Sequence, residues 1–184
     1  GEDSALRLNA MTHDADNHGA SSSKKGIAPT YRWGIGSRDE FSVGLYHLET
    51  DGQPLYNHPW FTANGKIEPT LPAKNYYGLA SDHLKTESSY ATFSHLHRFS
   101  QDSELKTTVR TGHYERDLLA SAVRFAPAAQ QPGGLAVTAD NLSADSVLSR
   151  SPKARVGYSD LTQIQSDYSD KFQAFGKQHS LIAG

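Results

Sequence analysis

Alternation of apolar and polar positions is clearest in residues 87–116, where it predicts two long strands joined by a tight polar turn at 100–103. In the second strand one set of alternate positions is mainly apolar and the other is polar and cationic. The first set is Leu105, Thr107, Val109 and Thr111; the second is Lys106, Thr108, Arg110, Gly112, Tyr114 and Arg116. A period of two places alternate side chains on opposite faces of a sheet. This strand therefore separates an apolar face from a polar, cationic one.

The length of these strands distinguishes a membrane barrel from the sheet of an ordinary globular protein. Each runs for roughly ten residues or more, whereas strands of globular proteins usually have about five or six. A tilted strand that crosses a bilayer as part of a barrel needs about nine to eleven residues. The hairpin therefore predicts strands of a membrane barrel.

The same pattern predicts further strands at 5–13, 27–36, 41–47, 162–172 and 179–184. The alternation is cleanest in 27–36, where Ile27, Pro29, Tyr31, Trp33 and Ile35 share one face. Residues 14–25 are rich in Ser, Asp, Asn and Gly, so we expect a solvated loop there. Short turns are expected at 37–40 and near Gly176.

Two long segments interrupt the strands, at 51–86 and 117–158, and both are rich in proline. Loops beyond about twelve to fifteen residues are unusual in compact domains. Long loops that alternate with tight turns are typical of outer-membrane barrels, with extracellular loops at one rim and short periplasmic turns at the other. The predicted fold class is all-β: an antiparallel up-and-down meander that forms part of a transmembrane β-barrel.

Composition agrees with this prediction and removes several alternatives. Hydrophobic residues make up 36% of the 184 residues and the mean hydropathy is −0.60. That is low for a packed core but suits a barrel with a wet interior, where only one face of each strand is apolar. The net charge of −2 gives no case for a nucleic-acid partner. There is no cysteine for a disulfide or a thiolate metal site.

Six stretches carry a resemblance to a known family and follow one another in the order of that family. They are 26–30 (Gly-Ile-Ala-Pro-Thr), 56–60 (Tyr-Asn-His-Pro-Trp), 75–82 (Asn-Tyr-Tyr-Gly-Leu-Ala-Ser-Asp), 110–114 (Arg-Thr-Gly-His-Tyr), 165–167 (Gln-Ser-Asp) and 179–184 (His-Ser-Leu-Ile-Ala-Gly). With them the chain resembles the TonB-dependent outer-membrane siderophore receptors, closest to the catecholate branch. His95 departs from the family, which tends to have an aliphatic lipid-facing residue there, and Ile164 replaces a usual Asn.

The resemblance implies that residues 1–184 are only part of a barrel domain. The family has an N-terminal plug domain, an energy-coupling box and about twenty-two strands, whereas the pattern here predicts about seven strands and no plug. We expect an internal barrel fragment that cannot transport anything by itself. By resemblance its parent lies in the bacterial outer membrane and imports ferric siderophore. Its implied partners are outer-membrane lipid and the TonB energy-coupling complex, reached through the missing N-terminal region.

The chemistry of the implied ligand suggests which residues bind it. A ferric catecholate already fills the coordination sphere of its iron, so the protein needs cations for its negative charge and aromatic faces for its rings. No protein-bound cofactor is expected. The candidate ligand-binding residues on predicted loops and upper inward faces are Tyr56, Trp60, Phe61, Tyr76, Tyr77, Tyr114, Arg116, Lys153 and Arg155. The alternative is that Tyr76 and Tyr77 pack the base of a loop and that Arg116 pairs with a lumen carboxylate.

Two other groups of residues have a structural and a functional interpretation. His95 and His97 share a strand face and have the spacing of a chelating pair, but no carboxylate or third histidine stands at convincing spacing, so no metal site is expected. Tyr31 and Trp33 suit an interfacial aromatic girdle, and an ordinary sheet core is the alternative.

Signatures of enzymes are missing from the sequence. Gly34-Ile35-Gly36 lacks the third glycine of a dinucleotide-binding turn, and there is neither a Gly-x-Ser-x-Gly elbow nor a phosphate-binding loop. We expect no enzymatic activity. The competing function is a soluble β-sandwich module for ligand binding or adhesion, which would bury the apolar faces of two sheets against each other.

Overall fold

The computed structural model describes residues 2–56, 58–63, 65–69 and 71–184. Asn57, within one of the stretches that carry the resemblance, lies outside this part. Seven antiparallel strands form one sheet in the order β1-β2-β3-β6-β7-β8-β9. Their bounds are β1 Ser4–Asn17, β2 Ala20–Trp33, β3 Asp39–Gly52, β6 His83–Arg98, β7 Ser103–Phe125, β8 Leu148–Ala174 and β9 Lys177–Ala183. A separate hairpin pairs β4 (Trp60–Ala63) with β5 (Lys66–Pro69).

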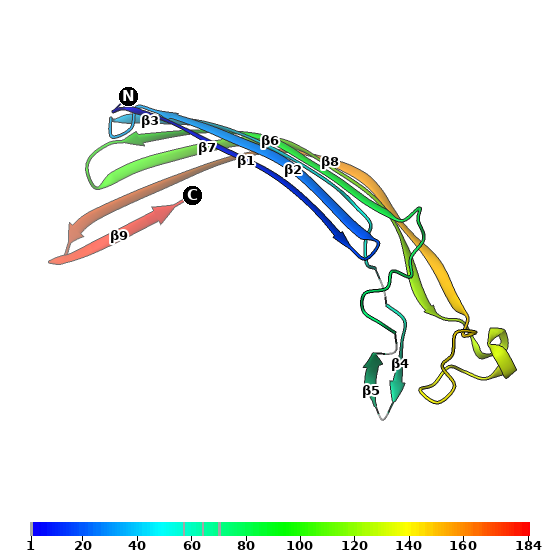
Figure 1. Ribbon diagram of the computed structural model, residues 1–184. Helices are drawn as coiled ribbons and strands as arrows, with labels where there is room; N and C mark the ends of the chain where they lie inside the picture. The colour runs from blue at the N-terminus through cyan, green and yellow to red at the C-terminus, as the bar shows by residue number, and fades with distance from the viewer. Residues whose placement is uncertain (1, 57, 64, 70) are drawn as a thin grey trace.

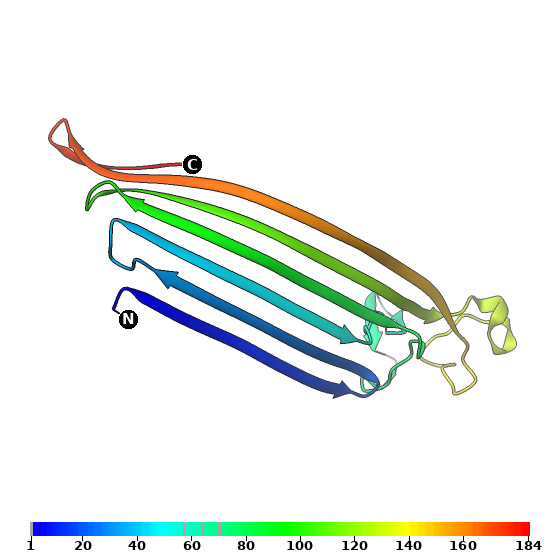
Figure 2. The same cartoon turned by 90° about the horizontal axis from the view of Figure 1, so that it is seen from above.

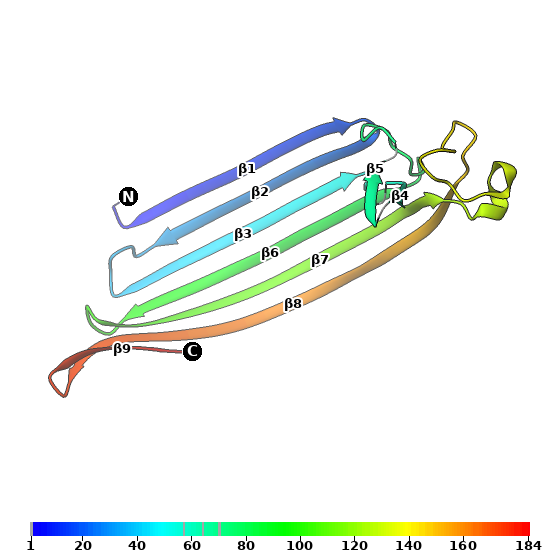
Figure 3. The same ribbon diagram turned by 90° about the horizontal axis from the view of Figure 1, so that it is seen from below.

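The sheet is an up-and-down meander that bends into a long arc (Figure 1). Figures 2 and 3 show the strands side by side in sequence order, except that the β4–β5 hairpin leaves the sheet between β3 and β6. Short turns after β2, β6 and β8 lie at the end near both termini. The long segments 53–82 and 126–147 lie at the other end. The predicted fold class is thereby confirmed.

Several strands are longer than the sequence predicted, and the expected loop at 14–25 is wrong. β1 and β2 continue through this segment and reverse at His18 and Gly19, both with positive φ. The loops at 51–86 and 117–158 are shorter too, because β6, β7 and β8 extend into them. The extension through 14–25 was missed because both its faces are polar, so the sequence shows no apolar alternation there. In the extension of β7, apolar residues fall on both faces, including the buried Leu118 and Val123, so alternation is absent there too. The β4–β5 hairpin was also not predicted.

The cross-strand register pairs the apolar positions of neighbouring strands with one another, so that they lie on one face of the sheet, here called the apolar face. Phe93 pairs with Val109 and Val43, and Val109 pairs with Ile164. Large apolar side chains are exposed along this band: Leu6, Leu8, Ile27, Tyr31, Val43, Leu45, Phe93 and Ile164. A soluble β-sandwich would cover such a face with a second sheet, but in the described residues the only other sheet is the β4–β5 hairpin.

Both ends of the apolar band are marked by a change in side-chain chemistry. Toward the short turns, Trp33 stacks on Tyr31 at 5.7 Å and on Phe41 at 5.4 Å between ring centroids. Toward the long segments the same face becomes charged, as where His113 Nδ1 lies 2.6 Å from Asp160 Oδ1. This order fits a hydrocarbon layer with an aromatic rim. The described residues contain no helix that is both long enough and apolar enough to cross a membrane.

Candidate functional site

The other face, here called the polar face, carries an aromatic and cationic cluster in the middle of the sheet. Tyr46 of β3 and Tyr90 of β6 are cross-strand partners whose rings stack at 4.6 Å with an angle of 10°. The guanidinium carbon of Arg110 on β7 lies 4.7 Å from the Tyr90 ring centroid. Arg110 Nε also donates a hydrogen bond to Thr92 Oγ1 at 3.1 Å. These contacts hold a cation against an aromatic face.

A glycine makes room for this cluster. A Cβ on Gly112 would lie 2.8 Å from Tyr90 Cβ and 2.9 Å from the Tyr114 hydroxyl oxygen. The Tyr114 ring therefore lies over the backbone at Gly112, beside Tyr90. Of these residues only Tyr114 is among the candidates predicted from the sequence. Tyr46, Tyr90 and Arg110 were not predicted, although their parity along the strands assigns all three to the polar face.

The structure brings four predicted candidates onto adjacent strands. Tyr114 pairs with Ser159, Arg116 with Gly157, and Leu118 and Ala120 pair with Arg155 and Lys153 respectively. Three of these side chains are exposed and positively charged: Arg116, Lys153 and Arg155. They lie on the polar face between the aromatic and cationic cluster and the long segments. The polar face thus combines aromatic rings with cations along β7 and β8.

The predicted loop residues divide into two groups. Tyr56, Tyr76 and Tyr77 line a crevice of only about 10 Å³, which has room for about one water molecule. Trp60 and Phe61 belong to the separate hairpin, where Phe61 lies 6.4 Å from the Phe125 ring and Trp60 is exposed. In the described part of this segment, the predicted aromatics are thus divided between a small crevice and a separate hairpin.

Tyr76 helps to anchor the segment before β6 through a buried carboxylate. Asp82 is 3% exposed, and its Oδ2 accepts hydrogen bonds from the Tyr76 hydroxyl at 3.3 Å and the Leu79 N–H at 3.1 Å. Burial, together with the nearby negative charge of Asp82, raises the pKa of Tyr76 to about 12. Arg150 Nε donates to the Tyr77 carbonyl at 2.7 Å. Tyr76 is thus held at the base of this segment by its side chain and Tyr77 by its backbone carbonyl, and their role in ligand binding stays a prediction.

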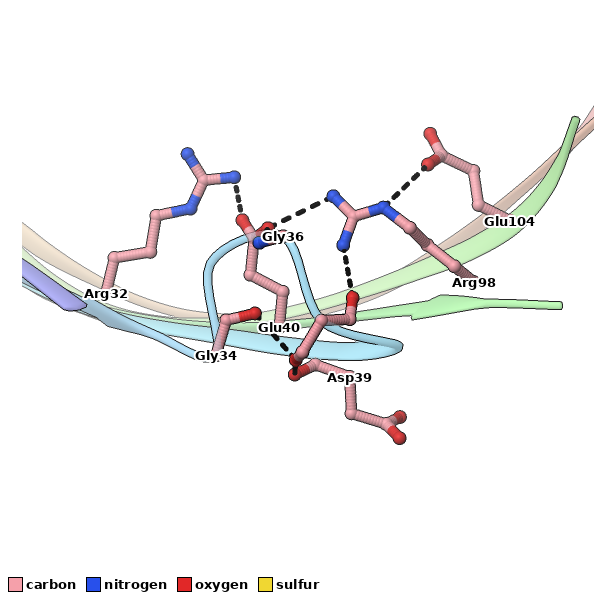
Figure 4. A network of polar contacts seen from close by, with 8 residues as sticks. Arg32, Gly34, Gly36, Asp39, Glu40, Arg98 and Glu104 are labelled. Atoms are coloured by element: carbon pink, nitrogen blue, oxygen red, sulfur yellow. Dashed lines mark hydrogen bonds and ion pairs between the residues drawn. The ribbon is translucent and has the colours of Figure 1, made fainter. Parts of the chain in front are cut away.

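A second buried carboxylate lies on the polar face beside the turn between β2 and β3 (Figure 4). Glu40 is 4% exposed and forms ion pairs with Arg32 and with Arg98, the latter at 3.0 Å. Arg98 also donates to the Ser37 carbonyl at 2.7 Å. Figure 4 shows the neighbouring Asp39 carboxylate pointing away from that of Glu40. The network joins the turn to three strands, β2, β3 and β6, and was not predicted from the sequence.

Comparison with known proteins finds similar sequences that are all named as receptors. No family model matches the sequence. The catecholate siderophore receptor Fiu of Escherichia coli O157:H7 is 26% identical over 137 residues, covering 67% of this chain and 18% of the receptor. The probable TonB-dependent receptor BfrD of Bordetella pertussis is 30% identical over 118 residues, covering 60% of this chain and 16% of that protein. The chain thus spans less than a fifth of the length of these relatives, all of which are named as receptors.

Solved structures show the same relationship at the level of the fold. The closed form of the ferric-catecholate import receptor Fiu from E. coli K12 has a TM-score of 0.74 at 20% identity, covering 95% of this chain and 26% of that one. The siderophore receptor PiuA from Acinetobacter baumannii has a TM-score of 0.76 at 20% identity, covering 95% and 24%. These findings bear out the predicted fold and the predicted outer-membrane location. They confirm that the chain resembles the TonB-dependent siderophore receptors.

Proposed function

We propose that residues 1–184 form part of the barrel wall of an outer-membrane receptor that binds and imports a ferric siderophore. The sheet has two edge strands, β1 and β9, so this part of the chain encloses no channel of its own. The stretch that the relatives share with it makes up only 18% and 16% of their own length. In this proposal the plug and the remaining strands belong to other parts of the receptor, and transport requires all of them.

The observation that carries the proposal is the division of the sheet into an exposed apolar face and a polar face rich in aromatic and cationic side chains. The exposed apolar face, which includes Leu8, Leu45 and Ile164, suits contact with outer-membrane lipid. The polar face, with Tyr90, Arg110 and Arg116, then lines the lumen. A ferric catecholate carries negative charge and aromatic rings, and this face offers a partner for each.

The function proposed is non-enzymatic, because the bound iron complex only has to be recognised and passed on. The ligand supplies hard oxygen donors to its own iron, so the wall does not need to coordinate the metal. Energy for release into the periplasm would come from the TonB complex, which would contact a part of the receptor outside residues 1–184. The soluble β-sandwich alternative has no support in the described sheet, whose apolar face is uncovered.

The test uses the complete receptor, purified in detergent and titrated with a ferric catecholate while its intrinsic fluorescence is recorded. We expect Arg110→Gln to weaken binding about tenfold, as loss of a half-buried cation held against an aromatic face would. Joint substitution of Arg116, Lys153 and Arg155 by Gln is expected to weaken binding further. Lys85→Gln is the matched control, because it removes the same charge from the apolar face, where Lys85 pairs with Asp51 at 3.7 Å.

Two outcomes would contradict the proposal at different levels. If the complete receptor neither binds ferric catecholates nor supports growth on them under iron limitation, the transport function fails. If it binds them but the polar-face variants bind as tightly as the unmodified receptor, only the assignment of these residues fails.

A further inference from the structure

Three side chains that offer metal-ligating atoms meet on the apolar face at the end near the short turns. Asp39 Oδ1 lies 2.8 Å from His95 Nε2 and 2.6 Å from His97 Nδ1. The three candidate ligand atoms all lie within 4.8 Å of one another. Asp39 is the first residue of β3, and both histidines lie near the end of β6.

The register of the sheet explains why these residues meet. His95 and His97 are two residues apart on one strand, so both point to the apolar face. Asp39 is the direct cross-strand partner of His97, and its neighbour on the same face, Phe41, is the partner of His95. Asp39 is therefore diagonal to His95, within reach of its ring. The histidine pair is visible in the sequence, but the third ligand is not, because Asp39 lies 56 residues before His95 and only strand pairing brings it close.

From this geometry we propose that Asp39, His95 and His97 bind one divalent ion of the first transition series, such as Zn²⁺. Imidazole nitrogen and carboxylate oxygen are ligands that these ions accept. With metal–ligand bonds of about 2.0–2.2 Å, ligand atoms around a tetrahedral ion lie about 3.4 Å apart. The two hydrogen-bonded distances would open by less than about 1 Å when the ion replaces the shared protons, a change within the reach of side-chain rotation.

Neighbouring aromatic rings hold the two histidine ligands in place, and the site stays open to solvent. The His95 ring stacks on Phe41 at 4.5 Å with an angle of 7°, and the His97 ring meets Phe99 edge-on at 4.7 Å. These contacts fix the ring planes, so less order must be imposed when the ion binds. The side chains of Asp39, His95 and His97 are 43%, 36% and 24% exposed, so the remaining coordination positions are open to water.

The site lies at the rim of the sheet formed by the short turns, beside the aromatic residues Trp33 and Phe41. It is on the opposite face from the aromatic and cationic cluster. Its geometry depends only on the strand register, not on the identity of any ligand of the polar face. The inference is therefore independent of the proposed siderophore function: either one can fail while the other stands.

The experiment is a calorimetric titration of the complete receptor with Zn²⁺ in a buffer that does not bind metals, with any purification tag removed. We expect one ion per receptor, released again by a chelator. His97→Gln and Asp39→Asn are expected to weaken the affinity at least about tenfold. His95→Phe tests the third ligand while keeping an aromatic ring against Phe41, which protects the fold. Co²⁺ serves as a second probe, because its visible absorption reports ligation directly.

A matched control is available on the same face. His113 lies between two carboxylates, with Nδ1 2.6 Å from Asp160 and Nε2 2.9 Å from Glu115. His113→Gln removes a histidine with comparable hydrogen bonds and is expected to leave Zn²⁺ affinity unchanged. Wild-type affinity weaker than roughly millimolar, or equal affinity in wild type and in the three ligand variants, would overturn the proposal. Thermal unfolding of each variant establishes that it is folded before the titration is interpreted.

Discussion

Asp82 and Ser121 join the segment before β6 to the far half of β7 through two hydrogen bonds to one buried carboxylate. The Ser121 N–H donates to Asp82 Oδ2 and its hydroxyl to Asp82 Oδ1, both at 2.9 Å. Ser121 is 4% exposed, and Ala120 beside it is fully buried. The two hydrogen bonds link residues that are 39 apart in the sequence. They hold the base of the long segment that contains β4 and β5 against β7.

The first prediction concerns this connection. Asp82→Ala leaves the donors of Tyr76, Leu79 and Ser121 without their acceptor in a buried place, at a cost of about 3 kcal/mol. We expect the segment 53–82 to become sensitive to limited proteolysis of the receptor while the strands stay protected. Asp140→Ala, an exposed change of the same chemistry in the other long segment, should leave the cleavage pattern unaltered. Equal protection in both variants would show that Asp82 does not anchor the segment.

The second prediction concerns the pH dependence of the same cluster. Tyr76 has a pKa of about 12 against an ordinary value of 10.0, so the fold favours its neutral form. The stabilisation is complete below about pH 10 and is lost as the pH rises from there to about 12. Subtracting the absorbance titration of Tyr76→Phe at 295 nm from that of the unmodified receptor isolates this group. A difference curve centred at pH 10 would contradict the burial of Tyr76 against Asp82.

The third prediction concerns the carboxylate shared by two arginines. Glu40→Gln removes a buried charge from between Arg32 and Arg98, and we expect it to lower the free energy of unfolding by about 1–3 kcal/mol, since both arginines are partly exposed. Glu104→Gln is the control, because its pair with Arg98 is 4.0 Å long and 46% exposed on the glutamate side. It should cost at most about 1 kcal/mol. Thermal unfolding of both variants provides the measurement, and equal losses would remove any special role for Glu40.

The fourth prediction compares two strand glycines. A Cβ at Gly112 would press on Tyr90 and Tyr114, whereas a Cβ at Gly157 on the neighbouring strand would meet no atom within 4 Å. We expect Gly112→Ala to destabilise the receptor by about 1–3 kcal/mol. Gly157→Ala should be neutral or slightly stabilising, because alanine loses less backbone entropy on folding. Denaturant unfolding distinguishes the two, and equal effects would contradict the close packing around Gly112.

Part of the site was accessible to sequence reasoning because it depends only on parity along a strand. Arg110, Tyr114 and Arg116 could be assigned to one face from residues 105–116 alone. The contacts of the loop aromatics could not be predicted in this way: the Tyr76 hydroxyl bonds to Asp82, and the Tyr77 carbonyl accepts from Arg150. Arg150 lies 73 residues after Tyr77, and although Asp82 is only six residues from Tyr76, no periodic pattern in this irregular segment predicts that the two meet.

The sequence by itself determined the class of this protein: long strands, two chemically different faces, and long segments alternating with tight turns. These features follow from side-chain alternation, a local property of the backbone. Only the tertiary structure decided which strand residues face one another. It placed Tyr46 on Tyr90, Asp39 beside His95 and His97, and Asp82 against Ser121. It also extended β1 and β2 through 14–25, because backbone pairing continues where neither face is apolar and side-chain alternation gives no signal.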